Sequence, residues 1–157
     1  TGAQVIASAA DRDFIEGRRK TAAMGREGFG GKLFKIALYL METVLFRYEP
    51  ALVDTALTAD TELNLSDIAI QALATPGHSL GSFSFYLPDK KVLFTGDALT
   101  GIPVPRLPPR PGCADYAQAI ASVKRISGFA FDICCFGHGE TVRKNAAEVV
   151  RILAHQM

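Results

Sequence analysis

The chain has 157 residues, enough for one domain of ordinary size, and 48% of them are hydrophobic, which is sufficient for a packed core. Its 17 Lys and Arg residues against 16 Asp and Glu leave a formal net charge of +1, so charge gives no general attraction to nucleic acid or to an anionic membrane. Three cysteines, two of them adjacent, do not form a disulfide framework, so we expect a reducing compartment and, by default, the cytoplasm.

The first 48 residues predict one short strand and two helices. Residues 4–8 suit a short buried strand, and Ser8 followed by Asp11 resembles a capping box that would start a helix over about 9–19. Residues 32–48 place their charged side chains in one strip of a helix and leave a wide apolar face that needs cover. Because residues 33–48 contain three charged residues, this stretch is too polar to span a bilayer.

The pattern of hydrophobic residues changes to a period of two from residue 61, as strands require. A Pro-rich loop over 101–112 separates the later elements. Strand pairs followed by helix, strand and helix indicate a layered α/β fold. The predicted strands cover 68–74, 82–87, 91–95 and 131–136, and the predicted helices cover 114–127 and 140–154.

Two histidines and one aspartate each follow a predicted strand. His78 lies in Thr-Pro-Gly-His-Ser, Asp97 follows Thr-Gly, and His138 lies in Gly-His-Gly. Imidazole nitrogens and carboxylate oxygens are ligands that zinc and similar metals prefer. Taken singly, such residues are more often turn or surface residues. Three strand ends at one sheet edge could nevertheless bring these side chains together, so we interpret them as candidate metal ligands.

Two segments of the chain resemble a known family. The runs ATPGHSLGSFSFYLPDKKVLFTGDAL (74–99) and CCFGHGET (134–141) are similar to the second half of the metallo-β-lactamase superfamily. That family's pattern is Thr-Pro-Gly-His-Ser/Thr-x-Gly-Ser, then Phe-x-Gly-Asp, then a late Gly-His, and the match covers 61–154. The resemblance implies an αββα sandwich with metals at one edge. Residues 1–157 would form a single partial domain, the C-terminal portion of this fold, with a helical insertion at about 9–48.

The resemblance also implies roles for the candidate ligands. His78 would be the third histidine of a first metal site, Asp97 would bridge two metals, and His138 would complete the second site. The metals would be zinc, with iron or manganese as alternatives, and they would activate water for hydrolysis. The family's His-x-His-x-Asp-His motif is absent from residues 1–157. We therefore expect this chain to be truncated, to bind metal weakly and to be inactive alone.

The predicted function is metal-dependent hydrolysis of a small ester or thioester, as in the glyoxalase II-like branch. Arg106 and Arg110, in the loop after Asp97, are candidates for binding an anionic substrate, although exposed loop arginines more often serve solubility. The alternative is a non-catalytic interaction module that uses the apolar helix 32–48. An intact upstream His-x-His-x-Asp-His motif would favour the enzyme over the module.

A small-molecule substrate is the expected partner, and neither nucleic acid nor membrane is expected. A homodimer or a retained N-terminal fragment is also expected, because Phe83, Phe85 and Val92 would otherwise lose their cover.

Other polar residues have structural interpretations. Ser79 and Thr75 are expected to cap the turn around His78 rather than to contact a ligand. Cys134 and Cys135 are expected in a buried strand, and the third histidine, His155, is expected to be exposed to solvent.

Overall fold

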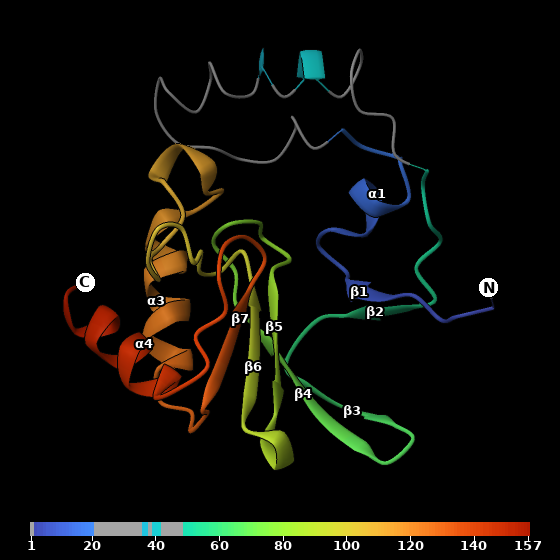
Figure 1. The fold of residues 1–157 in the computed structure, drawn as a ribbon. Helices are drawn as coiled ribbons and strands as arrows, with labels where there is room; N and C mark the ends of the chain where they lie inside the picture. Colours follow the sequence, from blue (N-terminus) through green and yellow to red (C-terminus); the bar gives the residue numbers. More distant parts are fainter. Residues whose placement is uncertain (1, 21–35, 38, 42–48) are drawn as a thin grey trace.

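A five-stranded sheet forms the centre of the molecule (Figure 1). The computed structural model describes residues 2–20, 36–37, 39–41 and 49–157. The strand order is β3-β4-β5-β6-β7, and all neighbours are antiparallel except β6 and β7, which are parallel. The bounds are β3 (Thr61–Leu65), β4 (Ile68–Ala74), β5 (Phe83–Leu87), β6 (Val92–Gly96) and β7 (Ile133–Phe136). The predicted strands β4 to β7 are confirmed, and β3 falls in the segment where the period-two pattern begins.

Two helices, α3 (Tyr116–Ile126) and α4 (Ala146–His155), cover one face of this sheet (Figure 1). The hydrophobic core lies between the sheet and these helices. Leu93 of β6 and Val123 and Ile126 of α3 are all 0% exposed there. Burying each such side chain contributes about 1.5–3 kcal/mol. Because side chains alternate along a strand, the alternate positions of β5 and β6 point to the opposite face.

A second, smaller sheet lies on that opposite side (Figure 1). It consists of β1 (Ile6–Ser8) and β2 (Thr55–Leu57), which pair in parallel. The strand predicted at 4–8 is confirmed in part, and β2 was not predicted. A cavity of about 230 Å³ separates the two sheets and is lined by apolar residues of both, among them Leu57 and Phe85.

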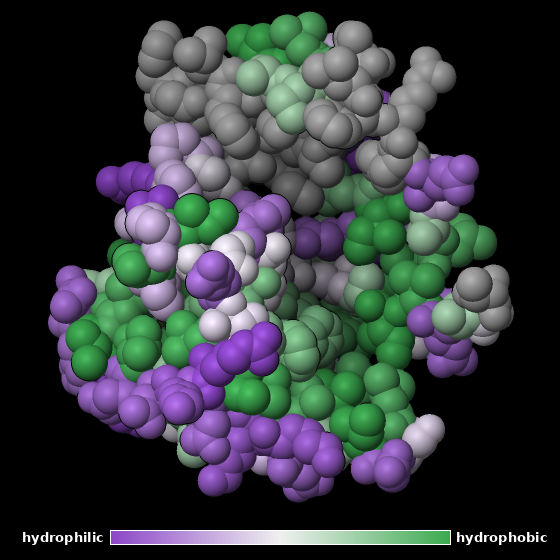
Figure 2. Space-filling view, in the orientation of Figure 1, coloured by the Kyte–Doolittle hydropathy of each residue, from purple (hydrophilic) through white to green (hydrophobic). Residues whose placement is uncertain are grey.

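The face of the central sheet turned away from α3 and α4 is apolar and incompletely covered. Phe83, Phe85 and Val92 are half-buried, whereas Phe94, which pairs with Phe85, is 43% exposed. Leu65 is also exposed, and Figure 2 shows hydrophobic residues gathered around β1 to β4. The expected partner for this face stays a prediction.

The first helix is shorter than predicted. α1 spans Arg12–Ile15, not 9–19. The hydroxyl of Ser8 accepts a hydrogen bond from the backbone N–H two residues later, at 3.1 Å, instead of forming a capping box. Gly17 has a φ of +71°, a left-handed conformation that ends the helix.

The last helix begins later than predicted. It starts at Ala146 rather than at residue 140, because Val142 instead exchanges backbone hydrogen bonds of 2.9 and 3.0 Å with Cys134 of β7. Asn145, with a φ of +52°, then turns the chain into the helix.

The predicted insertion at 9–48 lies partly outside the described residues, as does most of the helix predicted over 32–48. Its described residues, 36–37 and 39–41, are helical, and Ile36 and Leu40 are more than half exposed. No helix in the described part of the chain is long and apolar enough to cross a membrane.

Candidate metal centre

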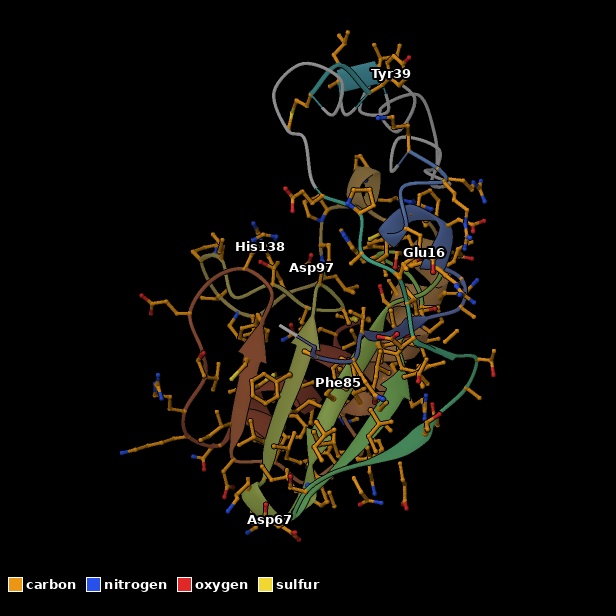
Figure 3. All side chains as sticks on the ribbon, turned by 90° about the vertical axis from the view of Figure 1, so that its right-hand side faces the viewer. Glu16, Tyr39, Asp67, Phe85, Asp97 and His138 are labelled. Carbon is orange, nitrogen blue, oxygen red and sulfur yellow. The ribbon has the colours of Figure 1, made fainter. Side chains whose placement is uncertain are left out.

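Three strand-end side chains meet at one edge of the central sheet. His78 follows β4, Asp97 follows β6 and His138 follows β7. The Oδ2 atom of Asp97 lies 3.7 Å from Nε2 of His78, and its Oδ1 atom lies 3.6 Å from Nε2 of His138. Figure 3 shows Asp97 and His138 together at this end of the sheet. The structure therefore brings together three residues that lie up to 60 residues apart in the sequence.

Two glycines allow Asp97 to occupy this position. Gly96 has a φ of +53°, which turns the chain sharply at the end of β6. Gly137 donates its backbone N–H to the carbonyl of Gly96 at 2.8 Å. A Cβ atom on Gly137 would lie only 2.4 Å from Oδ1 of Asp97. The carboxylate can therefore lie against the backbone that follows β7 only because residue 137 is glycine.

The His78 turn is held against the start of α3. The carbonyl of His78 accepts a hydrogen bond from the N–H of Ala114 at 3.0 Å. Gly77 has a φ of +147°, and a Cβ there would lie 2.4 Å from Cα of Ala119. The α3 N-terminus itself is capped by Asp115, which accepts from the N–H of Gln118 at 2.9 Å. The rigid helix therefore fixes the backbone on which the imidazole is mounted.

Thr75 and Ser79 bond within the protein, although Thr75 does not cap the turn as expected, because its hydroxyl pairs with Ser84 of β5. The hydroxyls of Thr75 and Ser84 lie 3.0 Å apart and are buried. The Ser79 hydroxyl donates to Oδ2 of Asp11 at 2.5 Å and also lies 3.0 Å from the Ser82 hydroxyl.

His138 is more exposed than the other two residues, with 71% of its side chain accessible. Its carbonyl accepts a hydrogen bond from the N–H of Gly101 at 2.8 Å. Gly139 has a φ of +96° and forms a parallel β-bridge with Gly101. A Cβ on Gly139 would lie 2.4 Å from the Gly101 carbonyl carbon. Close backbone packing therefore holds the turn while the imidazole remains accessible.

The three side chains line a cavity of about 360 Å³. The loop after Asp97 supplies the other wall, including Ile102, Arg106, Pro108 and Pro109. Arg106 is held there because its backbone N–H and carbonyl each bond Thr100 at 2.9 Å. The guanidinium of Arg110 instead lies 5.4 Å from the centre of the Tyr116 ring.

Cys134 and His155 agree with their structural interpretations, whereas Cys135 is less buried than expected. Cys134 is 0% exposed, and burial, with the neighbouring Cys135, raises the pKa of its thiol to about 12. Cys135 is half-buried, and His155 is exposed on α4.

The separations between Asp97 and the two histidines fit pairs of metal ligands. Among the described residues, no three His, Cys, Asp or Glu side chains are arranged around one point that could hold a metal. The two oxygens of Asp97 instead face different histidines. Two ligands of one tetrahedral zinc, each bonded at 2.0–2.1 Å, lie about 3.4 Å apart. The observed separations of 3.7 and 3.6 Å are close to this value.

Comparison with known proteins supports the same family. Residues 3–138 match the sequence model of the Metallo-beta-lactamase superfamily. A hydroxyacylglutathione hydrolase of Bartonella tribocorum is 32% identical over 102 residues, which cover 65% of this chain and 39% of that relative. A hydroxyacylglutathione hydrolase of Brucella ovis is 38% identical over 55 residues, 35% of this chain and 21% of the relative. The chain thus spans well under half the length of these relatives.

Solved structures show the same fold. A metallo-beta-lactamase family protein from Thermus thermophilus matches 99% of this chain and 51% of its own, with a TM-score of 0.63 and 19% identity. An archaeal metallo-beta-lactamase superfamily protein from Sulfolobus tokodaii matches 98% of this chain and 57% of its own, with a TM-score of 0.65 and 21% identity. At these identities the likeness shows the fold alone.

Proposed function

The chain belongs to the metallo-beta-lactamase superfamily, and from this membership and the site geometry we propose that His78, Asp97 and His138 are ligands in the two-metal centre of a hydrolase. The observation that carries the proposal is the orientation of the Asp97 carboxylate: one oxygen faces the imidazole of His78 and the other faces that of His138. A small ester or thioester is the proposed substrate, and the name of the hydroxyacylglutathione hydrolase relatives supports a thioester.

Members of this superfamily generally bind divalent metals, and zinc is the proposed metal here, with iron or manganese as alternatives. His78 and Asp97 would hold one ion, and Asp97 and His138 the other. A metal pair supplies an acidified water and stabilises a developing oxyanion. Because a catalytic zinc normally has three protein ligands, each ion needs at least one further ligand besides these.

The residues that line the cavity beside the candidate ligands suit an anionic substrate with an acyl chain. The guanidinium of Arg106 would bind an anionic group, because it is the cationic side chain among the residues that line the cavity. Ile102, Pro108 and Pro109 offer an apolar surface to an acyl chain. A substrate role for Arg110, which stacks on Tyr116, remains a prediction.

Zinc titration of the chain tests the proposed ligands. We expect residues 1–157 alone to bind zinc weakly, and Asp97→Asn to weaken both sites because it removes the shared carboxylate. His78→Ala and His138→Ala should each weaken one site, by at least the roughly 10–100-fold that loss of a ligand's hydrogen-bond partner costs. His155→Ala is the matched control, since His155 is exposed on α4.

Two outcomes would contradict the proposal. One is an equal loss of zinc affinity in His155→Ala and His78→Ala. The other is tight binding of two zinc ions with efficient hydrolysis by residues 1–157 alone, which would mean that ligands other than these three complete the centre.

A further inference from the structure

The carboxylate of Asp11 does not serve the helix that it begins. Asp11 is the N-cap residue of α1, a position where an aspartate side chain usually accepts a hydrogen bond from the first helical turn. Within the described turn, the Asp11 side chain accepts no such bond. Its Oδ2 atom instead accepts a 2.5 Å hydrogen bond from the hydroxyl of Ser79, 68 residues further along the chain. Such a short bond to a carboxylate is among the stronger hydrogen bonds in proteins.

Ser79 connects this carboxylate to the His78 turn. It follows His78 directly, is only 8% exposed, and its backbone N–H donates to the Ser82 hydroxyl at 3.0 Å. The approach of Asp11 is also sterically close. A Cβ on Gly81 would lie 2.5 Å from Cγ of Asp11, so a side chain larger than glycine there would push the two segments apart.

The turn therefore has two separate supports. The α3 side holds its beginning, where the Ser122 hydroxyl donates to the carbonyl of Pro76 at 2.7 Å and the N–H of Asp115 donates to the carbonyl of Gly77 at 3.0 Å. The other side is held by Asp11, from the segment that joins β1 to α1. His78 lies between these two anchors.

We infer that Asp11 is a positioning residue for His78. Through Ser79, it fixes the turn from which the imidazole faces Asp97. The positioning itself depends only on the contacts just described, whereas its effect on metal binding rests on the proposed function. Residues that orient a metal ligand through a hydrogen bond change metal affinity by about 10–100-fold when they are replaced.

The experiment compares Asp11→Ala and Asp11→Asn with Asp13→Ala in the full 157-residue chain. Asp13 is the matched control, because it lies in the same helix but pairs with the exposed Arg18. Amide hydrogen exchange is measured over residues 76–82 and over β4 and β5 without metal. Denaturant unfolding reports the global stability, and competition titration reports the zinc affinity.

In Asp11→Ala we expect exchange over residues 76–82 to rise about tenfold, the change that loss of a hydrogen bond to a charged group produces. Exchange in β4 and β5 should stay unchanged, and zinc affinity should fall by about 10–100-fold. Asp11→Asn, which keeps an acceptor oxygen, should recover most of both losses. Asp13→Ala should match the wild type. Adding Asp11→Ala to Ser79→Ala should have little further effect, since both remove the same bond.

Unchanged exchange over 76–82 in Asp11→Ala would overturn the inference. So would a rise in exchange that extends equally through β4 and β5, because that pattern indicates a general loss of stability. Faster exchange in the turn with unaltered zinc affinity would also overturn it, since His78 would then not depend on the contact. If the wild type binds no zinc at all, the proposed metal centre is wrong, and the exchange measurements and the double variant alone decide the role of Asp11.

Discussion

Gly137→Ala offers a direct test of the carboxylate at the centre of the site. The added Cβ would lie 2.4 Å from Oδ1 of Asp97, whereas an unstrained carbon–oxygen contact is about 3.3 Å, so the carboxylate must move by roughly 0.9 Å. The backbone at Gly137 is not in the left-handed region, so alanine adopts it without strain. The substitution therefore acts through steric contact, chiefly with Asp97, since the added Cβ would also lie 3.2 Å from the carbonyl carbon of Gly96.

The size of this movement determines the expected effect on metal binding. Metal–ligand distances in proteins tolerate deviations of only about 0.2 Å. A displacement several times larger removes the 3.6 Å approach of Oδ1 to Nε2 of His138. We expect zinc affinity to fall by about 10–100-fold. The free energy of unfolding should fall by only about 1–2 kcal/mol, because Asp97 is partly exposed and can rotate towards solvent.

Zinc competition titration and denaturant unfolding measure the two effects separately. Gly112→Ala is the control, because no described atom lies within 4 Å of a Cβ added there and its backbone also permits alanine. Zinc affinity equal to that of the wild type in a folded Gly137→Ala variant would mean that Oδ1 of Asp97 is not a metal ligand.

Three further predictions concern the rest of the fold. Leu93→Ala should lower the free energy of unfolding by about 3 kcal/mol in urea denaturation, because Leu93 is 0% exposed between the sheet and its helices; a loss below about 1 kcal/mol would contradict this packing. A side-chain hydrogen bond from Arg12, with a backbone one from Val53, lowers the pKa of Glu16, so its stabilising effect is present above about pH 4.5 and is lost as the pH falls through its folded pKa. Glu16→Gln should therefore be less stable than the wild type at pH 7, with a difference that shrinks in acid, and a pH-independent difference would contradict the assignment. Cys134, whose thiol pKa is raised to about 12, should resist alkylation at pH 8 while the half-buried Cys135 reacts, and equal labelling rates in the folded protein would show that Cys134 is accessible.

Local sequence patterns were sufficient to predict several strands and the candidate ligands. Residues 68–74 form a strand with the predicted bounds, because alternation and flanking turn residues lie within one short window. The positions of His78, Asp97 and His138 after strands were readable for the same reason. Gly and Pro residues indicate where a strand ends, so a histidine or aspartate next to them can be recognised from the sequence as a candidate metal ligand.

Features that depend on partners distant in sequence became visible only in the folded chain. β1 pairs with β2, 49 residues away, and residues 55–57 carry no strong strand signal of their own. The carboxylate of Asp11 looked like part of a helix cap, yet it bonds Ser79 across 68 residues. Likewise, the sequence could place Asp97 near two histidines but could not show that each oxygen faces a different one. Hydrogen bonds between distant segments outweigh intrinsic secondary-structure propensities, which amount to a few tenths to one kcal/mol per residue. A short stretch of sequence contains only one of the two bonded partners, so it cannot reveal such a bond.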